Sequence, residues 1–205
     1  MLSNLALQKL VSDFEFQTVL DIGSGQGLHA KAFADAGKVV TAIDLGKSIY
    51  YGQRAENYDN ILVQAVDFYS IDTSVQYDCV WASHVLEHQR NTGLFLEKCF
   101  KLCRNVFAVT VPPLKHDIVG GHVTLWNPGL LLYNMILAGF DCRDASVKAY
   151  DYNISVIVEK KTVPARILDS LHYDYGDIVR LREYFPFEVQ EGFPGNEIME
   201  WYWST

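Results

Sequence analysis

Short aliphatic runs alternate with helix-like segments from residue 18 to residue 111, and this alternation restricts the possible folds more than any other feature of the sequence. The runs have the length and β-branched content of strands. They are Thr18–Ile22, Val39–Ile43, Ile61–Val66, Tyr77–Ala82 and Asn105–Val111, and the helix-like segments between them are Leu28–Ala36, Lys47–Asn57 and Thr92–Cys103. Because parallel strands need crossover connections that cover the sheet, the pattern predicts an α/β fold with a doubly wound, mainly parallel sheet.

Further elements are predicted on both sides of this region. Residues Leu2–Phe14 space their apolar side chains as an amphipathic helix does. Pro128–Leu137 is predicted to be a helix with Asn127 as its N-cap. Asp141–Ala149 and Asn153–Lys160 are close enough in sequence to form a hairpin, which cannot be parallel. The sheet is therefore predicted to end in a C-terminal antiparallel hairpin strand.

The chain is predicted to hold one domain over residues 1–163 and a C-terminal extension over residues 164–205 that packs on the same domain. The extension is polar and rich in tyrosine, and Ala165–Glu183 has a helical pattern. About 40 residues rarely hold a core of their own, so we expect no second domain. For the aromatic ending Trp201–Trp203 we expect packing as well, with the lining of an acceptor pocket as the alternative.

The composition is that of a folded, acidic protein. Hydrophobic residues make up 49% and charged residues 20% of the 205 residues, and the net charge is −8. That charge repels phosphate backbones and no lysine- or arginine-rich run offsets it, so we expect no nucleic acid partner. No stretch is apolar for the ~18 residues that a membrane span needs, and we expect a cytoplasmic protein without a membrane partner. The four cysteines are too scattered for a disulfide framework and are expected to be reduced.

Three glycines alternate with other residues where the first predicted strand meets the first predicted helix after it. They are Gly23, Gly25 and Gly27, and they permit positive φ angles and the close approach of a ligand to the backbone. The helix that follows offers free N–H groups and the positive end of its dipole. Dinucleotide-binding enzymes use a similar turn with glycine at the position that Leu28 occupies here. A tight turn without a ligand is the remaining alternative.

Acidic residues follow the next two predicted strands. Asp44 stands where nucleotide-binding sheets place a carboxylate that accepts from ribose hydroxyls, with a helix N-cap as the alternative. Asp67 precedes Phe68, so the carboxylate could accept from an adenine amino group while the ring packs on the base. A turn aspartate is the alternative for Asp67. Together with the glycines, these acids predict a nucleotide-containing ligand at the carboxyl edge of the sheet.

These segments resemble the successive motifs of class I S-adenosylmethionine-dependent methyltransferases. The similar motifs are Val19 to Gly27, Asp44, Val66-Asp67-Phe68 and Tyr77-Asp78-Cys79-Val80, and the resemblance runs from about Thr18 to Lys160. It implies a Rossmann-like sheet and S-adenosylmethionine as the cofactor. In that family the glycine loop touches the methionine part, the second-strand acid binds ribose and the third-strand acid binds adenine.

The resemblance also implies which residues bind the cofactor and where the acceptor enters. The expected cofactor-binding residues are Asp21, Gly23, Ser24, Gly25, Gly27, Asp44, Leu45, Asp67, Phe68 and Ser83. The segment Ser83 to His88 is similar to the family's segment after the fourth strand, where the cofactor's amino-acid end meets the methyl acceptor.

Histidines near this region are the candidates for a catalytic base. His84, His88 and His122 follow the fourth or fifth predicted strand, and a base is useful when the acceptor is a hydroxyl. A structural role for His88, such as bonding a loop carbonyl, is an equal alternative. His84 and His88 also have the i, i+4 spacing of a helical metal pair. We expect no metal, because the pair Glu87-His88 is common in this family without one.

The sequence thus predicts a methyltransferase that acts on a small-molecule or sugar-containing acceptor, at oxygen. The segment Pro112–Trp126 is a candidate lid, with two prolines at one end and a glycine pair near the other. A nicotinamide-dependent oxidoreductase and a non-catalytic cofactor-binding partner protein are the competing interpretations. A homo-oligomer is compatible with all three interpretations.

Overall fold

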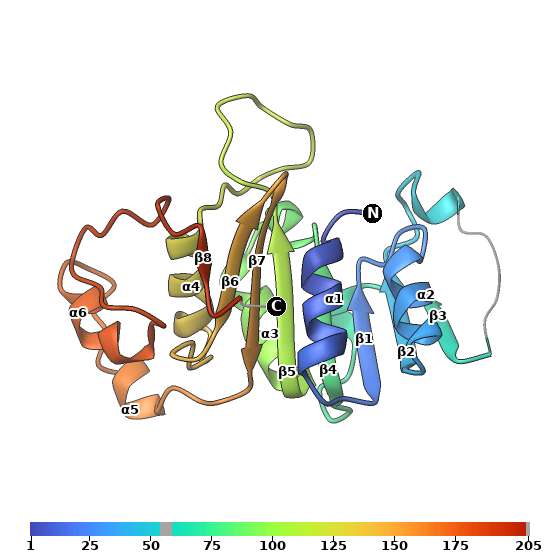
Figure 1. Cartoon of the computed structure of the whole chain (residues 1–205), viewed down its shortest axis with the longest axis horizontal. Coiled ribbons are helices and arrows are strands. Elements are labelled where there is room, and N and C mark those ends of the chain that lie inside the picture. Colours follow the sequence, from blue (N-terminus) through green and yellow to red (C-terminus); the bar gives the residue numbers. More distant parts are fainter. Residues whose placement is uncertain (54–58, 204–205) are drawn as a thin grey trace.

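The computed structural model describes residues 1–53 and 59–203 and has one eight-stranded sheet in the order β3-β2-β1-β4-β5-β7-β6-β8 (Figure 1). The strands are β1 (Thr18–Ile22), β2 (Val39–Asp44), β3 (Ile61–Ala65), β4 (Tyr77–Ser83), β5 (Cys103–Val111), β6 (Ser146–Tyr150), β7 (Asn153–Glu159) and β8 (Glu200–Trp201). Neighbours among β1 to β5 are parallel, whereas β7 is antiparallel to both β5 and β6. The predicted mainly parallel sheet with an antiparallel hairpin strand is confirmed.

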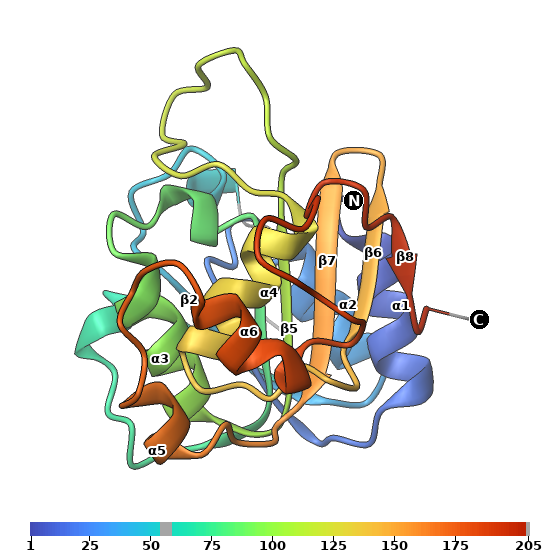
Figure 2. The same cartoon turned by 90° about the vertical axis from the view of Figure 1, so that its left-hand side faces the viewer.

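Helices cover both faces of the sheet, as a doubly wound fold requires. Helices α1 (Asn4–Asp13) and α2 (Leu28–Asp35) lie on one face, and α3 (Thr92–Leu102) and α4 (Pro128–Leu137) lie on the other (Figure 2). Each face has its own apolar core. The strand residues of both cores are buried, which explains why the sequence of the central strands reads as continuous aliphatic runs.

Strand β4 contributes buried side chains to both apolar cores. Successive side chains of a strand point to opposite faces. Cys79 and Trp81 therefore join the core under α1 and α2, whereas Val80 and Ala82 join the core under α3 and α4. All four side chains are at most 1% exposed. A polar residue at any of these positions would be buried and would need a hydrogen-bond partner inside the core.

Helix α4 begins where the sequence predicted. The Asn127 side chain accepts the backbone N–H of Leu130 at 2.8 Å, and Pro128 occupies the first helical position. Helix α3 has the same kind of cap, with the Asn91 side chain accepting the N–H of Leu94 at 3.1 Å. Both caps satisfy a donor that the helix itself cannot pair.

Three predicted elements differ from the structure. Of the helix predicted over Lys47–Asn57, residues 54–57 lie outside the described residues, and the described part contains only a short 3-10 turn, η1 (Tyr51–Gln53). The strand predicted from Asp141 begins only at Ser146, because the Asp141 carboxylate accepts the N–H of Arg143 at 3.2 Å and forms a turn.

The third difference is the helix predicted over Ala165–Glu183, which is broken into α5 (Ala165–Leu168), α6 (Asp177–Leu181) and the 3-10 turn η4 (Arg182–Tyr184). The reason is the buried Asp177 carboxylate. It accepts the backbone N–H groups of His172 at 3.0 Å and Asp174 at 3.3 Å, so the residues between α5 and α6 form a turn. A local helical pattern cannot reveal this bond, which favours the turn over a continuous helix.

The C-terminal extension packs on the sheet and on α4. Strand β8 pairs with β6, and Trp203 is buried in the core under α1. The extension also approaches α4 closely, because the N–H of Gly129 donates to the carbonyl of Gly195 at 3.0 Å. The division of the chain at residue 163 stays a prediction.

Two further sequence expectations concern the membrane and the cysteines. Within residues 1–53 and 59–203, no helix combines the length and the apolar character needed to cross a bilayer. All four cysteines are buried and free, namely Cys79, Cys99, Cys103 and Cys142.

We predict that Gly129→Ala destabilises the protein. A Cβ atom at Gly129 would lie 2.5 Å from the Cα of Gly195 and 2.8 Å from the Phe193 ring. Helix propensity alone would make the alanine variant more stable by about 1 kcal/mol. We expect instead a net loss of about 1–3 kcal/mol in the free energy of unfolding, which would have to come from overpacking. Urea unfolding measures the change. Gly120→Ala is the matched control, because a Cβ there meets nothing within 4 Å, and equal stability of the two variants would contradict the close packing.

Candidate cofactor and acceptor site

The glycine loop follows β1 at the carboxyl edge of the sheet. Gly23, Gly25 and Gly27 have φ angles of 69°, 47° and 82°, a region that other residues rarely adopt. The loop is pinned to the sheet, since the N–H of Ser24 donates to the Ile43 carbonyl of β2 at 2.9 Å. All three positions therefore have backbone conformations that favour glycine.

Asp44 at the end of β2 stabilises this loop. Its Oδ2 accepts the N–H of Gly25 at 3.0 Å, and its Oδ1 accepts the N–H of Gly46 at 2.9 Å. The side chain is half-buried, and the next residue, Leu45, is 58% exposed. The bond to the Gly46 N–H is of the kind that an N-cap residue makes, but no helix begins at Asp44 among the described residues. The carboxylate instead joins two loops at the edge where a ligand would sit.

Asp67 follows β3 and is exposed. Its Oδ1 accepts the N–H of Tyr69 at 2.9 Å and caps the 3-10 turn η2 (Phe68–Ser70). This contact is the turn aspartate that the sequence left as an alternative, and it leaves acceptor capacity on the carboxylate. Phe68 is 8% exposed and packs on Phe95 with ring centroids 4.8 Å apart. The roles of both residues toward an adenine stay predictions.

Asp21 and Ser83 lie at or near the carboxyl ends of neighbouring strands. Asp21 in β1 is 1% exposed. The Ser83 hydroxyl at the end of β4 lies 2.7 Å from the Ser3 hydroxyl, so the start of α1 also contributes to this edge. Their predicted contacts with the cofactor are not tested by these bonds.

His84 is held between two acceptors. Its Nε2 lies 3.0 Å from Asn153 Oδ1 and its Nδ1 lies 3.3 Å from Glu87 Oε1. Burial lowers the pKa of His84, but the interactions with Glu87 and Asn153 outweigh it and raise the pKa above its usual value. Both contacts stabilise the imidazolium form of His84 relative to its neutral form. The role of His84 as a catalytic base stays a prediction.

His88 ends the 3-10 turn η3 (Leu86–His88) and contacts the long loop between β5 and α4. Its Nδ1 lies 2.8 Å from the Gly121 carbonyl, to which it donates. The sequence alternative of a bond to a loop carbonyl is thus observed. His84 precedes η3 with a φ of 55°, so the two histidines do not share a helical face as their spacing suggested.

Glu87, His88 and His122 come together from two segments. Each offers one ligand atom, and these atoms all lie within 4.8 Å of one another. His88 Nε2 is 3.8 Å from Glu87 Oε1, and the rings of His88 and His122 meet edge to face at 5.0 Å. The backbone N–H groups of Val123 and Thr124 donate to the Glu87 carbonyl at 2.8 and 3.2 Å. The loop is therefore fastened beside Glu87.

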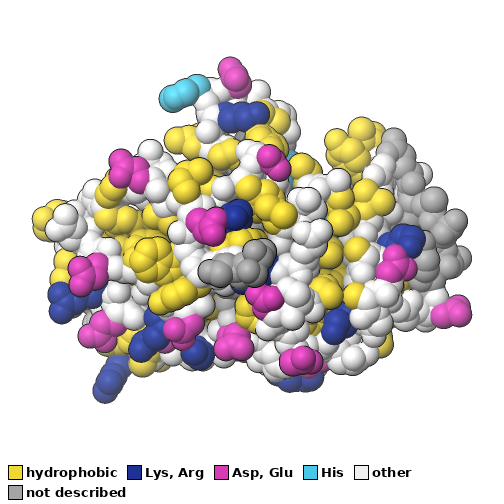
Figure 3. Space-filling view, viewed as in Figure 1, with side chains coloured by type: hydrophobic (Ala, Val, Ile, Leu, Met, Phe, Trp, Pro, Cys, Tyr) yellow, Lys and Arg dark blue, Asp and Glu magenta, His cyan; other side chains and the backbone are white. Residues whose placement is uncertain are grey.

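The loop over residues 112–126 projects from the carboxyl edge of the sheet (Figures 1 and 2). Its ends meet, since the N–H of Leu114 donates to the Trp126 carbonyl at 2.8 Å. Hydrophobic side chains are exposed on it, with Ile118 at 96%. On the face seen in Figure 3, acidic and basic side chains are interspersed, and yellow side chains reach into the projecting loop. Its role as a lid stays a prediction.

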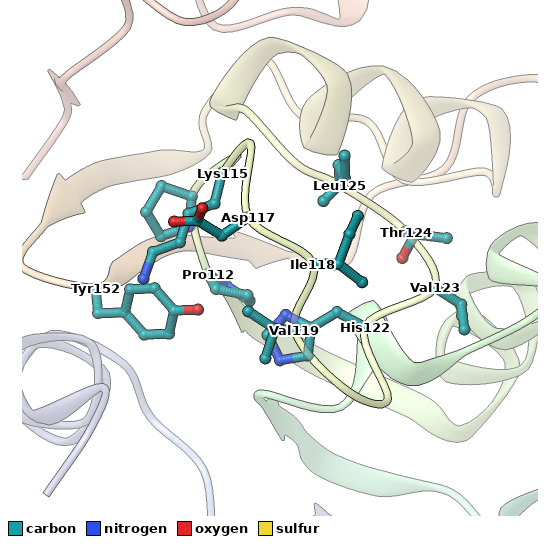
Figure 4. A pocket seen from close by; sticks show the side chains of 11 residues that line it. Pro112, Lys115, Asp117, Ile118, Val119, His122, Val123, Thr124, Leu125 and Tyr152 are labelled. Carbon is teal, nitrogen blue, oxygen red and sulfur yellow. The ribbon is translucent and has the colours of Figure 1, made fainter.

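A pocket of about 200 Å³ opens inside this loop (Figure 4). His122 and Tyr152 both line it. The ammonium of Lys115 lies 4.1 Å above the Tyr152 ring, and the His84 ring stacks on that tyrosine at 6.0 Å. The pocket therefore combines apolar side chains of the loop with polar groups of the same loop and with Tyr152 from the β6–β7 turn.

Sequence reasoning missed three residues of this region, namely Tyr152, Asn153 and Ser3. Tyr152 lies in the hairpin connection and Asn153 is the first residue of β7, and the sequence predicted both only as parts of the hairpin. Asn153 accepts the N–H of Ser3 at 3.2 Å and also contacts His84. The only signal for them was the antiparallel hairpin, which brings its turn beside the end of β4.

Comparison with known proteins agrees with the fold and the glycine loop. Residues 20–106 match the methyltransferase domain family. A curated relative is the ubiquinone biosynthesis O-methyltransferase of Rhodopseudomonas palustris, which is 29% identical over 136 residues, or 58% of this chain and 52% of that protein. The chain spans about half the length of this curated relative.

Solved structures give the same result. The Burkholderia thailandensis 1,6-didemethyltoxoflavin-N1-methyltransferase, crystallised with S-adenosylhomocysteine, has a TM-score of 0.62 and 19% identity over 78% of this chain and 80% of that chain. The N-terminal domain of EvdMO1, crystallised in the presence of S-adenosylhomocysteine and D-fucose, has a TM-score of 0.56 and 12% identity over 78% of this chain and 82% of that chain.

The fold is thus that of the class I S-adenosylmethionine-dependent methyltransferases, as the sequence motifs predicted. The match to the methyltransferase domain family covers residues 20–106, which run from within β1 to within β5 and include the glycine loop.

We predict that Gly23→Ala destabilises the protein more than Gly37→Ala does. Both glycines have positive φ, 69° and 78°, which costs a residue with a Cβ about 1–2 kcal/mol. A Cβ at Gly23 would also collide with Val85 Cγ2, whereas a Cβ at Gly37 meets nothing within 4 Å. Urea unfolding should show a further loss of about 1–3 kcal/mol for Gly23→Ala.

The double variant Gly23→Ala, Val85→Ala tests the cause. Truncation of Val85 leaves its Cβ 3.5 Å from the new atom, which is an ordinary contact. The loss caused by Gly23→Ala should therefore be smaller in a Val85→Ala background than in the wild type. Strict additivity of the two changes would show that the collision is not the cause.

Proposed function

We propose that this protein is an S-adenosylmethionine-dependent methyltransferase that transfers the methyl group to an oxygen atom of a small-molecule or sugar-containing acceptor. The observation that carries the proposal is the glycine loop between β1 and α2, whose three glycines have positive φ and stand beside the Asp44 carboxylate. The methyltransferase domain match over residues 20–106 supports it.

The residues at this edge fit the cofactor. Asp44 uses one bond on each carboxylate oxygen for the N–H groups of Gly25 and Gly46. A carboxylate has about four acceptor sites, so acceptor capacity for the two ribose hydroxyls remains. Asp67 is exposed and likewise keeps acceptor capacity for an amino group. The glycine loop, Asp44 and Asp67 are therefore our proposed cofactor-binding residues, together with Leu45 and Ser83 beside them.

S-adenosylmethionine, when bound, supplies a methyl group activated on a sulfonium sulfur. The chain's own contribution is alignment, because holding donor and acceptor in line supplies a large part of the rate. We infer that the acceptor enters between the end of β4 and the loop over residues 112–126, where the pocket lies. The loop would then exclude water from the acceptor, which is the usual effect of a lid.

Support for the acceptor class comes from similar proteins. The Rhodopseudomonas palustris relative is named as an O-methyltransferase, and the EvdMO1 domain was crystallised in the presence of D-fucose. The Burkholderia thailandensis enzyme methylates a nitrogen, so the shared fold does not fix the atom. Oxygen in a small, hydroxyl-bearing acceptor is our proposal on the strength of the sequence relative. A homo-oligomeric state stays a prediction.

We predict that the protein binds S-adenosylmethionine and that Asp44→Ala weakens binding more than about tenfold. Hydrogen bonds to a charged acceptor contribute about 1.5–3 kcal/mol, and 1.4 kcal/mol corresponds to a factor of ten. Calorimetry on the full chain measures the affinity. Thermal stabilisation by nicotinamide dinucleotides alone would favour the oxidoreductase interpretation instead.

Asp35→Ala is the control for this experiment. Asp35 is an exposed acid at the end of α2 whose salt bridge with Lys31 is a surface i, i+4 pair. Loss of such a pair changes stability little, and the affinity for S-adenosylmethionine should stay within about twofold of the wild type. Unchanged affinity in a folded Asp44→Ala variant would remove Asp44 from the cofactor site.

The acceptor class is tested by release of S-adenosylhomocysteine. We expect turnover with hydroxyl-bearing acceptors, tested as phenols, catechols and hydroxylated sugars, and none with matched analogues in which hydrogen replaces the hydroxyl. Turnover with amines alone would contradict the proposal of an oxygen acceptor while leaving the cofactor assignment intact.

A further inference from the structure

A buried carboxylate without a full set of partners stands beside two histidines at the carboxyl edge of the sheet. Glu87 is 1% exposed, and its Oε2 has no hydrogen-bond partner among the described residues. A buried polar group left unpaired costs free energy, and a buried charge costs more. His84 Nδ1 lies 3.3 Å from Oε1 and offsets part of this cost, but Oε2 keeps no partner among the described residues.

The groups around Glu87 have the chemistry of a metal site. One carboxylate oxygen and one nitrogen each from His88 and His122 lie within 4.8 Å of one another. Imidazole and carboxylate are common ligands of zinc and related divalent ions. In a tetrahedral site with bonds of about 2.0–2.1 Å, neighbouring ligand atoms are roughly 3.3 Å apart. The 3.8 Å between His88 Nε2 and Glu87 Oε1 is about half an ångström wider. The full set lies within 4.8 Å, so the three side chains would have to draw together when an ion binds.

The orientation of His88 favours this use. Its Nδ1 donates to the Gly121 carbonyl at 2.8 Å, so Nδ1 carries a proton, and the other ring nitrogen, Nε2, lies 3.8 Å from Glu87 Oε1. A metal-binding histidine almost always donates its other ring N–H to a carbonyl or carboxylate in this way. Gly121 has a φ of 84°, and a Cβ there would lie 3.0 Å from His88 Nδ1. Glycine therefore permits the bond.

The loop brings His122 to the same place. The N–H groups of Val123 and Thr124 both donate to the Glu87 carbonyl, which fixes the residue next to His122 against Glu87. His88 is 43% exposed and His122 is half-buried, so an ion can enter from solvent. The loop with His122, the turn η3 with His88 and the buried Glu87 carboxylate therefore meet at one place.

We propose that Glu87, His88 and His122 bind one divalent transition metal ion, with zinc as the best match. Three protein ligands leave a fourth position for water or a ligand oxygen, which is the arrangement of an open zinc site. His122 also lines the pocket in the loop, so the open position lies beside that pocket. Occupation of this position by an acceptor oxygen rests on the proposed function, whereas the metal site does not.

This assignment differs from the sequence expectation. His88 and His122 are proposed as metal ligands and not as bases. The sequence predicted no metal, and the metal pair that its spacing suggested was His84 with His88. His84 is a positioning residue here, because its Nδ1 contacts Glu87 Oε1 at 3.3 Å.

The test is zinc binding by the full chain after treatment with a chelator, measured against a chromophoric competitor and without cofactor or acceptor. We expect one ion per chain, and we expect cobalt in the same site to give the visible absorption of a low-coordinate complex. His88→Ala and His122→Ala should each weaken zinc binding by more than about tenfold. Magnesium should not compete, because it prefers oxygen ligands.

His116→Ala is the matched control, since His116 is an exposed histidine of the same loop that is outside the cluster. Its affinity for zinc should stay within about twofold of the wild type. Glu87→Gln adds a second readout, because zinc should raise the melting temperature of the wild type but not of this variant. No zinc binding by the wild type, or binding that survives His122→Ala, would overturn the proposal.

The outcomes separate the metal site from the proposed function. Loss of zinc binding with intact S-adenosylmethionine binding is expected for His122→Ala, whereas Asp44→Ala should do the reverse. Binding of S-adenosylmethionine without any zinc binding overturns only the metal site, and zinc binding without S-adenosylmethionine binding overturns only the proposed function.

Discussion

The pairing of β1 with β4 is the interaction on which the rest of the site depends. The two strands run parallel and are neighbours, yet the chain leaves β1 toward β2 on one side and leaves β4 toward β5 on the other. The connections that follow them therefore diverge, and this is the switch point where open α/β sheets bind ligands. Val85, just after β4, packs so closely on Gly23, just after β1, that no Cβ fits between them.

Two sets of groups use this edge from opposite sides. On the β1 and β2 side, the glycine loop is joined to Asp44 by the bond to the Gly25 N–H. On the β4 and β5 side, Glu87 is buried and is bonded through its backbone carbonyl to the loop over residues 112–126. Cofactor and acceptor would then approach the junction of β1 and β4 from its two sides. Such an arrangement lets the sheet itself fix the line between donor and acceptor.

The central sheet was predictable because its signals are local and strong. Strands buried on both faces are mostly apolar along their whole length. The start of α4 was predictable from Asn127 as N-cap and Pro128 at the first helical position. The predicted helix over Ala165–Glu183 was wrong because the buried Asp177 carboxylate forms bonds with the backbone of His172 and Asp174. Those bonds join residues only three and five apart in the chain, but helical periodicity carries no trace of them.

The sequence by itself determined the fold class, the glycine loop and the positions of Asp44 and Asp67, because each follows from residues that are neighbours along the chain. Only the tertiary structure decided what surrounds Glu87. His122 reaches it through a loop whose path is set by backbone bonds to the Glu87 carbonyl, and Asn153 reaches His84 through the antiparallel hairpin. Contacts between residues far apart in sequence depend on how the loops and strands fold back on one another. No pattern of residue types along the chain records that path.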